Sequence, residues 1–153
     1  MSSLTLNQVI TRLETIGRSH KQIKECRTGD TLVFLKGGDL EYPACLIELL
    51  PGVISRTEKK SGLEFSIKLC DLINLAEDSK ENEIEVQSDL LSIAEDLISM
   101  YCDPQYQDTW TVVAEVPFEF QYEQLKDYVS ALSMTVTIWK RFDANRCQVP
   151  INS

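Results

Sequence analysis

The stretch from residue 63 to residue 101 constrains the fold more than any other part of the chain. It begins LEFSIKLCDLINL, in which apolar and polar side chains alternate with the period of a strand that has one buried face. It ends SDLLSIAEDLISMY, in which apolar residues recur every three or four positions, as in an amphipathic helix. Ser88 occupies an N-cap position and Asp89 the first turn, where both favour a helix start. One strand with one covering helix makes a core layer to which the other segments can add.

The remaining segments predict further elements of both kinds. An N-terminal helix is expected over residues 4–25, because Thr5 and Gln8 have the spacing of a capping box. Pro51-Gly52 predicts a turn. The expected strands span residues 31–36, 42–50, 63–73, 110–120 (broken or bent at Pro117) and 134–142. The second helix is expected over 88–102 and a hairpin tip over 53–62. Residues 77–85 are expected to form an exposed loop or an irregular helix start, residues 122–132 a short helix or a structured turn, and the tail after 142 is expected to be irregular.

These elements define the expected fold class. The connections between strands are mostly short, which favours antiparallel pairing. We therefore expect an α+β fold in a single domain over residues 1–153. Its sheet is expected to be mostly antiparallel, with four to five strands and two long helices packed on one face.

The net charge restricts the possible partners. At −9 over 153 residues, it argues against a surface built to grip a phosphate backbone or an anionic membrane. No apolar run approaches the roughly 20 residues that span a bilayer. The N-terminal residues also lack the basic start and apolar block of a secretory signal. We expect no membrane partner.

Neither the cysteines nor the acidic residues have the spacing of a metal site. The five cysteines are scattered and form no C-x-x-C pair, so free thiols in a reducing compartment are expected: Cys26, Cys45, Cys70, Cys102 and Cys147. The acidic residues lack both the calcium-loop spacing and its turn glycine, which favours a solvated loop: Asp71, Glu77, Asp78, Glu81, Glu83, Glu85 and Asp89. We expect no metal, cofactor or disulfide.

The sequence contains no short catalytic motif. Phosphate-binding, dinucleotide-binding, zinc-protease and nucleophile-elbow patterns are all missing from it. The single histidine, His20, lies on the apolar side of the first expected helix, without a nucleophile on the same face. We expect it to pack or to hydrogen-bond rather than to catalyse. The sequence therefore predicts a protein that is not an enzyme.

Five residues are candidates for an interface with another subunit or a partner. Arg56, Lys59 and Lys60 are a local reversal of sign on an acidic chain, at the expected hairpin tip. Trp110 and Trp139 are large side chains of the kind enriched both in cores and at interfaces. The alternatives are solvated charges for the first three and core positions for the two tryptophans.

An ordered set of segments resembles a known family over nearly the whole chain. The segments are SHKQIKECRTGD, YPACLIEL, LEFSIKLCDLINL, NEIEVQSDLLSIAEDLISMY and a closing Cys147-x-x-Pro150. Within them, His20 precedes Gly29-Asp30, Tyr42-Pro43 opens a strand, another strand ends in Asp71, and Asn82-Glu83 leads to Ser88-Asp89. In this order they resemble the tail-terminator and head-to-tail joining proteins of tailed bacteriophages, including the neck ring proteins of crAss-like phages. Residues 122–132 depart from that pattern, because no glycine turn precedes the last strand.

The resemblance implies a structural role in the virion. Such proteins form hexameric or dodecameric rings that close the tail tube or join it to the portal, and they carry no catalytic residues. The implied partners are other copies of the chain and other neck, portal or tail proteins. The protein would be made in the host bacterial cytoplasm, and DNA would pass through the ring without sequence-specific binding. An acidic lumen would let it slide.

Two other classes stay open at this point. A small acidic protein that binds or inhibits a host protein would fit the charge, and it would be monomeric or dimeric. An enzyme of a class without a short motif is the interpretation that the sequence supports least, because paired polar residues on one apolar face are missing from it.

Overall fold

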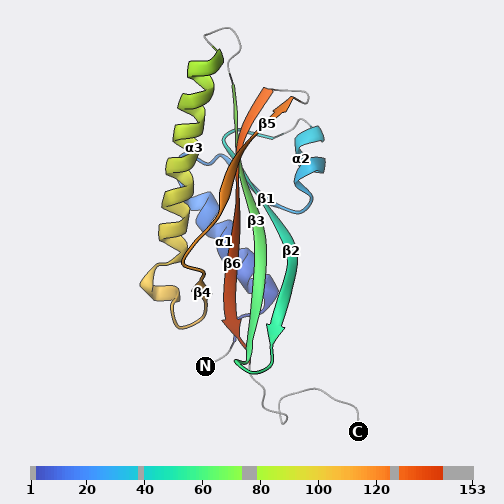
Figure 1. The fold of residues 1–153 in the computed structure, drawn as a ribbon, viewed down its shortest axis with the longest axis vertical. Coiled ribbons are helices and arrows are strands. Elements are labelled where there is room, and N and C mark those ends of the chain that lie inside the picture. The colour runs from blue at the N-terminus through green and yellow to red at the C-terminus, as the bar shows by residue number, and fades with distance from the viewer. Residues whose placement is uncertain (1–2, 38–39, 74–78, 125–127, 143–153) are drawn as a thin grey trace.

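A six-stranded mixed sheet carries two long helices on one face and one short helix on the other in the computed structural model of the chain (Figure 1). The structure describes residues 3–37, 40–73, 79–124 and 128–142. Its elements are α1 (Leu6–Ser19), β1 (Glu25–Thr28), α2 (Thr31–Gly37), β2 (Ala44–Ser55), β3 (Lys60–Leu72), α3 (Ser79–Tyr101), a 3-10 turn η1 (Pro104–Tyr106), β4 (Thr111–Val112), β5 (Phe118–Gln124) and β6 (Tyr128–Arg141). The predicted α+β class is confirmed, with more strands than expected.

The sheet has the order β1-β2-β3-β6, and β6 is flanked on its outer side by both β4 and β5. Only β1 and β2 run parallel; the other described pairs are antiparallel, as predicted. Thr111 of β4 lies opposite Trp139, and Phe118 of β5 lies opposite Met134. The strand expected over 110–120 is therefore two short pieces of one broken edge, with Pro117 directly before the second piece. A proline at the start of an edge strand is consistent with its missing N–H donor.

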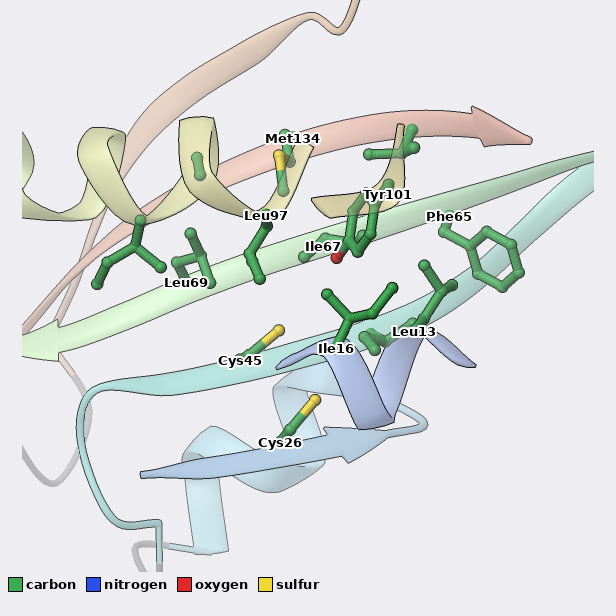
Figure 2. Close-up of a cluster of buried hydrophobic side chains, with 14 of the residues drawn as sticks. Leu13, Ile16, Cys26, Cys45, Phe65, Ile67, Leu69, Leu97, Tyr101 and Met134 are labelled. Carbon is green, nitrogen blue, oxygen red and sulfur yellow. The ribbon is translucent and has the colours of Figure 1, made fainter. Parts of the chain in front are cut away.

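The main core lies between the sheet and the two long helices (Figure 2). On β3, the alternating residues Phe65, Ile67 and Leu69 all face this core and are almost completely buried. They pack with Leu13 of α1 and Leu97 of α3. The predicted burial of the strand against the second helix is confirmed, as is the placement of both long helices on one face.

A smaller cluster covers the opposite face of the sheet at one end. It combines residues of α2 and of the segment after it with inward-facing residues of three strands: Leu35, Leu40, Leu46, Cys70, Val129 and Ala131. The strand predicted at 31–36 is wrong, because this segment is helix α2. Asp30 accepts a hydrogen bond from the Val33 N–H (3.4 Å) in the manner of an N-cap. Packing of Leu35 onto the sheet thus outweighs the β-propensity of the segment.

The N-terminal helix starts as predicted and ends early. The Thr5 hydroxyl accepts from the Gln8 N–H at 3.2 Å, and the Gln8 side chain accepts from the Thr5 N–H at 2.8 Å, which completes the capping box. The helix ends at Ser19 rather than at residue 25, because residues 25–28 form β1 and pair with β2. The apolar residues keep helical spacing beyond Ser19, but pairing with β2 makes residues 25–28 a strand.

The second long helix and the last strand both extend further than predicted. Helix α3 begins at Ser79, so residues 79–85, predicted as an exposed loop or an irregular helix start, are helical. Ser88, predicted as the N-cap, lies inside the helix. In the segment predicted as a short helix or structured turn, residues 122–124 end β5 and residues 128–132 begin β6. Residues 77–78, 125–127 and the tail from 143 lie outside the described residues. No described helix combines the length and the apolar character needed to cross a membrane.

The long β2–β3 hairpin contains a bulge where a turn was predicted. Both strands continue past Pro51-Gly52, and the register shifts between Leu50 and Val53. A side chain on Gly52 would place its Cβ 2.4 Å from the carbonyl oxygen of Gly62 on the partner strand. Glycine is therefore required by a close approach of two backbones, which is a common role of glycine in a bulge. The turn lies at residues 56–59, inside the predicted hairpin tip.

Candidate functional site

The hairpin tip, which we define as residues 53–60, joins positive charge to uncovered apolar side chains. Arg56 and Lys59 are exposed, and within the described chain neither has an ion-pair partner. The ammonium of Lys60 lies 3.9 Å from the Glu58 carboxylate, a surface pair that contributes little to stability. Val53 and Ile54 are 56% and 73% exposed. The tip thus offers a protein partner both positive charge and apolar surface.

The turn itself has a defined geometry. Lys59 adopts a φ of 55°, in the left-handed region that non-glycine residues rarely enter. The Ser55 hydroxyl accepts a hydrogen bond from the Glu58 N–H at 3.3 Å, which helps to close the turn. Behind it, the bulge at Gly52 fixes the register of both strands. The basic side chains are therefore mounted on an ordered end of the sheet.

A second uncovered surface lies along the broken edge of the sheet. Phe118, Phe120 and Tyr122 of β5 are between 39% and 49% exposed. They alternate along the strand on the side that faces α3, because Phe118 and Phe120 lie opposite the core residues Met134 and Leu132. The rings of Phe118 and Phe120 meet edge to face with centroids 5.7 Å apart. A row of exposed aromatic side chains on an edge strand is typical of an interaction site.

An apolar groove continues this surface onto α3. It has a volume of about 280 Å³ and is lined by residues of α3, the segment before β5, and β6: Leu91, Ala94, Glu95, Ile98, Val116, Phe118 and Met134. Glu95 alone among these lining residues is charged, and it is exposed. We call this hollow the α3–β5 groove. Its walls come from three separate segments of the chain, so no local sequence pattern reveals it.

Trp110, one of the candidate interface residues, belongs to the core. It is only 4% exposed, and its indole N–H donates to the carbonyl oxygen of Tyr101 at 2.9 Å. The Arg12 guanidinium lies over the Trp110 ring at 4.6 Å and over the Tyr106 ring at 4.4 Å. These contacts connect α1, the end of α3 and the chain before β4. The side chain thus has a structural role and offers almost no surface to a partner.

Trp139, the other candidate tryptophan, is half-buried on β6. It lies across Gly62 of β3, where a Cβ would come within 2.9 Å of its ring. Such cover of a strand glycine by an aromatic ring stabilises a sheet. Lys60, Trp110 and Trp139 also line one polar hollow of about 150 Å³, so the structure brings three of the five candidates together. Arg56 and Lys59 do not line this hollow.

His20 makes hydrogen bonds through both ring nitrogens. Its Nε2 lies 2.9 Å from the Asp96 carboxylate, and its Nδ1 accepts from the Gln22 N–H at 3.2 Å. This places the proton of the neutral ring on Nε2. The nearby hydroxyls of Ser19 and Ser99 donate to carbonyl oxygens of their own helices. The arrangement ties the end of α1 to α3 and leaves the ring no free nitrogen with which to activate a nucleophile.

Two buried thiols form a pair that cysteine spacing did not reveal. Cys26 and Cys45 are register partners on the parallel strands β1 and β2, next to the packed side chains of α1 (Figure 2). A hydrogen bond between the thiols lowers the pKa of Cys26, and the same bond together with burial raises that of Cys45. Both thiols are buried, as is Cys70, whereas Cys102 is exposed; Cys147 lies outside the described residues. In the described part of the chain, no three His, Cys, Asp or Glu residues cluster as metal ligands.

Comparison with known proteins supplies no family for the chain. A scan against protein-family models gives no match, and a search of the curated proteins finds no relative. The features that point to a function are therefore the two uncovered surfaces, the hairpin tip and the α3–β5 groove with its aromatic edge.

Proposed function

We propose that this chain is a structural subunit of a ring at the neck or tail top of a tailed bacteriophage, where the ring joins the head and portal to the tail or ends the tail tube. Its partners are other copies of itself, in a hexamer or dodecamer, and the adjoining neck, portal or tail proteins. The proposal agrees with the family that the ordered sequence segments resemble.

One observation carries this proposal: each molecule has two different uncovered surfaces that are separated along the length of the sheet. The turn of the β2–β3 hairpin lies at the lower end of the molecule and β5 near the upper end (Figure 1). A closed ring of identical subunits needs a heterologous interface, in which one surface of a subunit meets a different surface of the next. A dimer related by a twofold axis needs only one such surface.

The hairpin is suited to reach a neighbour. Its strands have 12 and 13 residues, so β2 extends about 40 Å at roughly 3.3 Å per residue. Near the end of β2 lie the exposed Val53 and Ile54, close to Arg56 and Lys59, for which the described residues supply no ion-pair partner. Contiguous exposed apolar side chains on a protein surface favour a partner.

The charge of the chain is compatible with a ring that DNA passes through. At −9, most of the surface repels phosphate, so a lumen wall of this composition would not hold the DNA. The basic residues of the hairpin tip would then serve protein contacts. Opposite charges across an interface fix register and speed encounter more than they add affinity.

The alternative function is a small acidic protein that binds or inhibits a host protein. Such a protein needs one binding surface and would be a monomer or dimer. The presence of two chemically different surfaces on separate elements favours the ring over this alternative.

Charge reversal at the hairpin tip tests the proposal. We expect the variant with Arg56, Lys59 and Lys60 changed to glutamate to fold normally, because exposed substitutions usually cost little. It should assemble poorly into particles, and high salt should weaken the association of the unmodified chain in the same way. The control is a variant with Lys21, Lys24 and Lys36 changed to glutamate, which has the same net charge and exposed positions elsewhere.

The two variants separate the possible outcomes. Normal particles from the hairpin variant would remove the hairpin tip from the interface. Equal loss of assembly in both variants would show that the loss depends on net charge and not on the hairpin tip. Particles that never contain the chain would end the ring proposal.

A further inference from the structure

We propose that the hairpin tip of one copy docks in the α3–β5 groove of the next copy, with Ile54 in the groove and Arg56 and Lys59 at its acidic rim. This inference rests on the proposed ring and names its subunit contact. It assigns the groove to a second copy of this chain rather than to a small molecule.

The size and the lining of the groove favour side chains of a protein as its occupant. Its volume, about 280 Å³, is at the lower limit of the roughly 300–1,000 Å³ of small-molecule sites. Its wall is almost entirely apolar, without the several convergent polar groups that orient a cofactor or substrate. A few aliphatic side chains would fill such a groove, and the exposed ring of Phe118 would be covered at the same time.

The charges around the groove complement those of the hairpin tip. Glu95 lies on the groove, and the exposed Glu115 directly precedes the lining residue Val116. On the hairpin, Arg56 and Lys59 lie within a few residues of the exposed Ile54. Both surfaces thus combine an apolar centre with charge at the side, and the two signs are opposite.

The positions of the two surfaces make the contact intermolecular. The groove lies at Met134, which pairs with Ile67 near the middle of β3, whereas the tip lies at the far end of the β2–β3 hairpin, so a tip cannot reach the groove of its own chain (Figure 1). Each copy therefore offers one tip and accepts one tip. Repeated head to tail, this contact generates a ring if the rotation closes.

Chemical cross-linking between two variants, each designed with one added cysteine at an exposed position, tests this docking. Both variants carry Cys102→Ser and Cys147→Ser, so that the three buried thiols remain. One has Thr57→Cys in the hairpin turn, and the other has Ser92→Cys, an exposed position one turn before Glu95 on α3. The two are mixed at high concentration and treated with a short bismaleimide. The control replaces Ser92→Cys by Val33→Cys on α2, where the side chain is 62% exposed.

Docking predicts roughly tenfold or more cross-linked dimer for the Thr57–Ser92 mixture than for the Thr57–Val33 mixture, because docking raises the local concentration of the two thiols. Lys59→Glu in the chain with Thr57→Cys should lower the yield of cross-linked dimer several-fold. Adding Glu95→Lys to the chain with Ser92→Cys should restore that yield. Lys36→Glu in the chain with Thr57→Cys, in place of Lys59→Glu, should leave the yield unchanged. Equal yields for the two mixtures would overturn the docking.

The same pair of thiols in purified particles separates this inference from the proposed function. A ring in the particle without the Thr57–Ser92 cross-link would remove the docking and keep the ring. A groove thiol that cross-links there to a different virion protein would also overturn docking by a second copy. A cross-link in solution from a chain that never enters particles would keep the docking and remove the phage function.

Discussion

The indole nitrogen of Trp110 donates a hydrogen bond of 2.9 Å to the carbonyl oxygen of Tyr101, the last residue of α3. The last carbonyl groups of a helix have no partner within the helix, so this bond satisfies one of them. The two rings also meet edge to face, with centroids 6.4 Å apart. These two contacts hold the C-terminal end of α3 against the segment that enters β4.

Trp110→Phe should therefore destabilise the fold. It keeps most of the ring packing but leaves the buried Tyr101 carbonyl without its donor, a loss of roughly 1–3 kcal/mol. Denaturant unfolding measures this as a lower midpoint with an unchanged slope. The control is Trp139→Phe, which makes the same substitution at a half-buried position on β6. An unchanged midpoint for Trp110→Phe would show that the hydrogen bond contributes nothing.

Tyr101→Phe should leave the stability unchanged or raise it. The Tyr101 hydroxyl is buried, and no hydrogen-bond partner for it is found among the described residues. Burial also raises its pKa well above the ordinary value. Removing an unsatisfied buried hydroxyl can stabilise a protein by about 1 kcal/mol. Thermal unfolding checks this, and a clear fall in Tm would reveal a partner such as a buried water.

Gly52→Ala should disturb the hairpin. The new methyl group would lie 2.4 Å from the Gly62 carbonyl oxygen, so the two backbones must separate. Overpacking of this kind costs about 1–3 kcal/mol. Val53→Ala at the neighbouring exposed position should change the free energy of unfolding by less than about 0.5 kcal/mol. Equal effects of the two substitutions, measured by denaturant unfolding, would contradict the close approach at the bulge.

Leu97→Ala should cost roughly 2–5 kcal/mol, because the side chain is fully buried between α3 and the sheet. Leu72→Ala, at a position on β3 that is 45% exposed, provides the control with the same chemical change. A loss below about 0.5 kcal/mol at Leu97 would mean that this face of α3 is not packed as described.

The sequence predicted the parts of the fold in which local pattern and burial agree. The alternation along β3 and the helical spacing along α3 both reflect burial on one side, so the strand, the helix from residue 88 onward and their shared core were predicted correctly, whereas the start of the helix at Ser79 was not. The capping box at Thr5 was visible because it depends only on neighbouring residues. Elements set by distant partners were not visible: β1 has four residues and exists through pairing with β2.

The two main errors have the same physical origin. Residues 31–36 have the composition of a strand, yet their helix is selected by packing of Leu35 on the sheet. Pro51-Gly52 has the composition of a turn, yet the hairpin needs glycine there for the close approach to Gly62. In both places tertiary contacts outweigh a local preference.

The candidate surfaces were predictable only in part. The basic residues of the hairpin tip are recognisable in the sequence because they are positive on an acidic chain, and in the structure they lie at the turn of the β2–β3 hairpin. Burial separates Trp110 from Trp139, which sequence could not do because both lie in strand-like patterns. The α3–β5 groove combines segments that are up to about forty residues apart, and its exposed aromatics follow the same alternation as core residues.

The decisive measurement for the proposed ring is electron microscopy of purified virus particles from the phage that encodes this chain. Mass spectrometry of the same particles establishes whether the chain is present. We expect a ring of six or twelve copies at the neck or tail top, with a hairpin from each subunit against its neighbour. Particles that lack the chain, or particles that hold it outside the neck and tail, would refute the proposed ring.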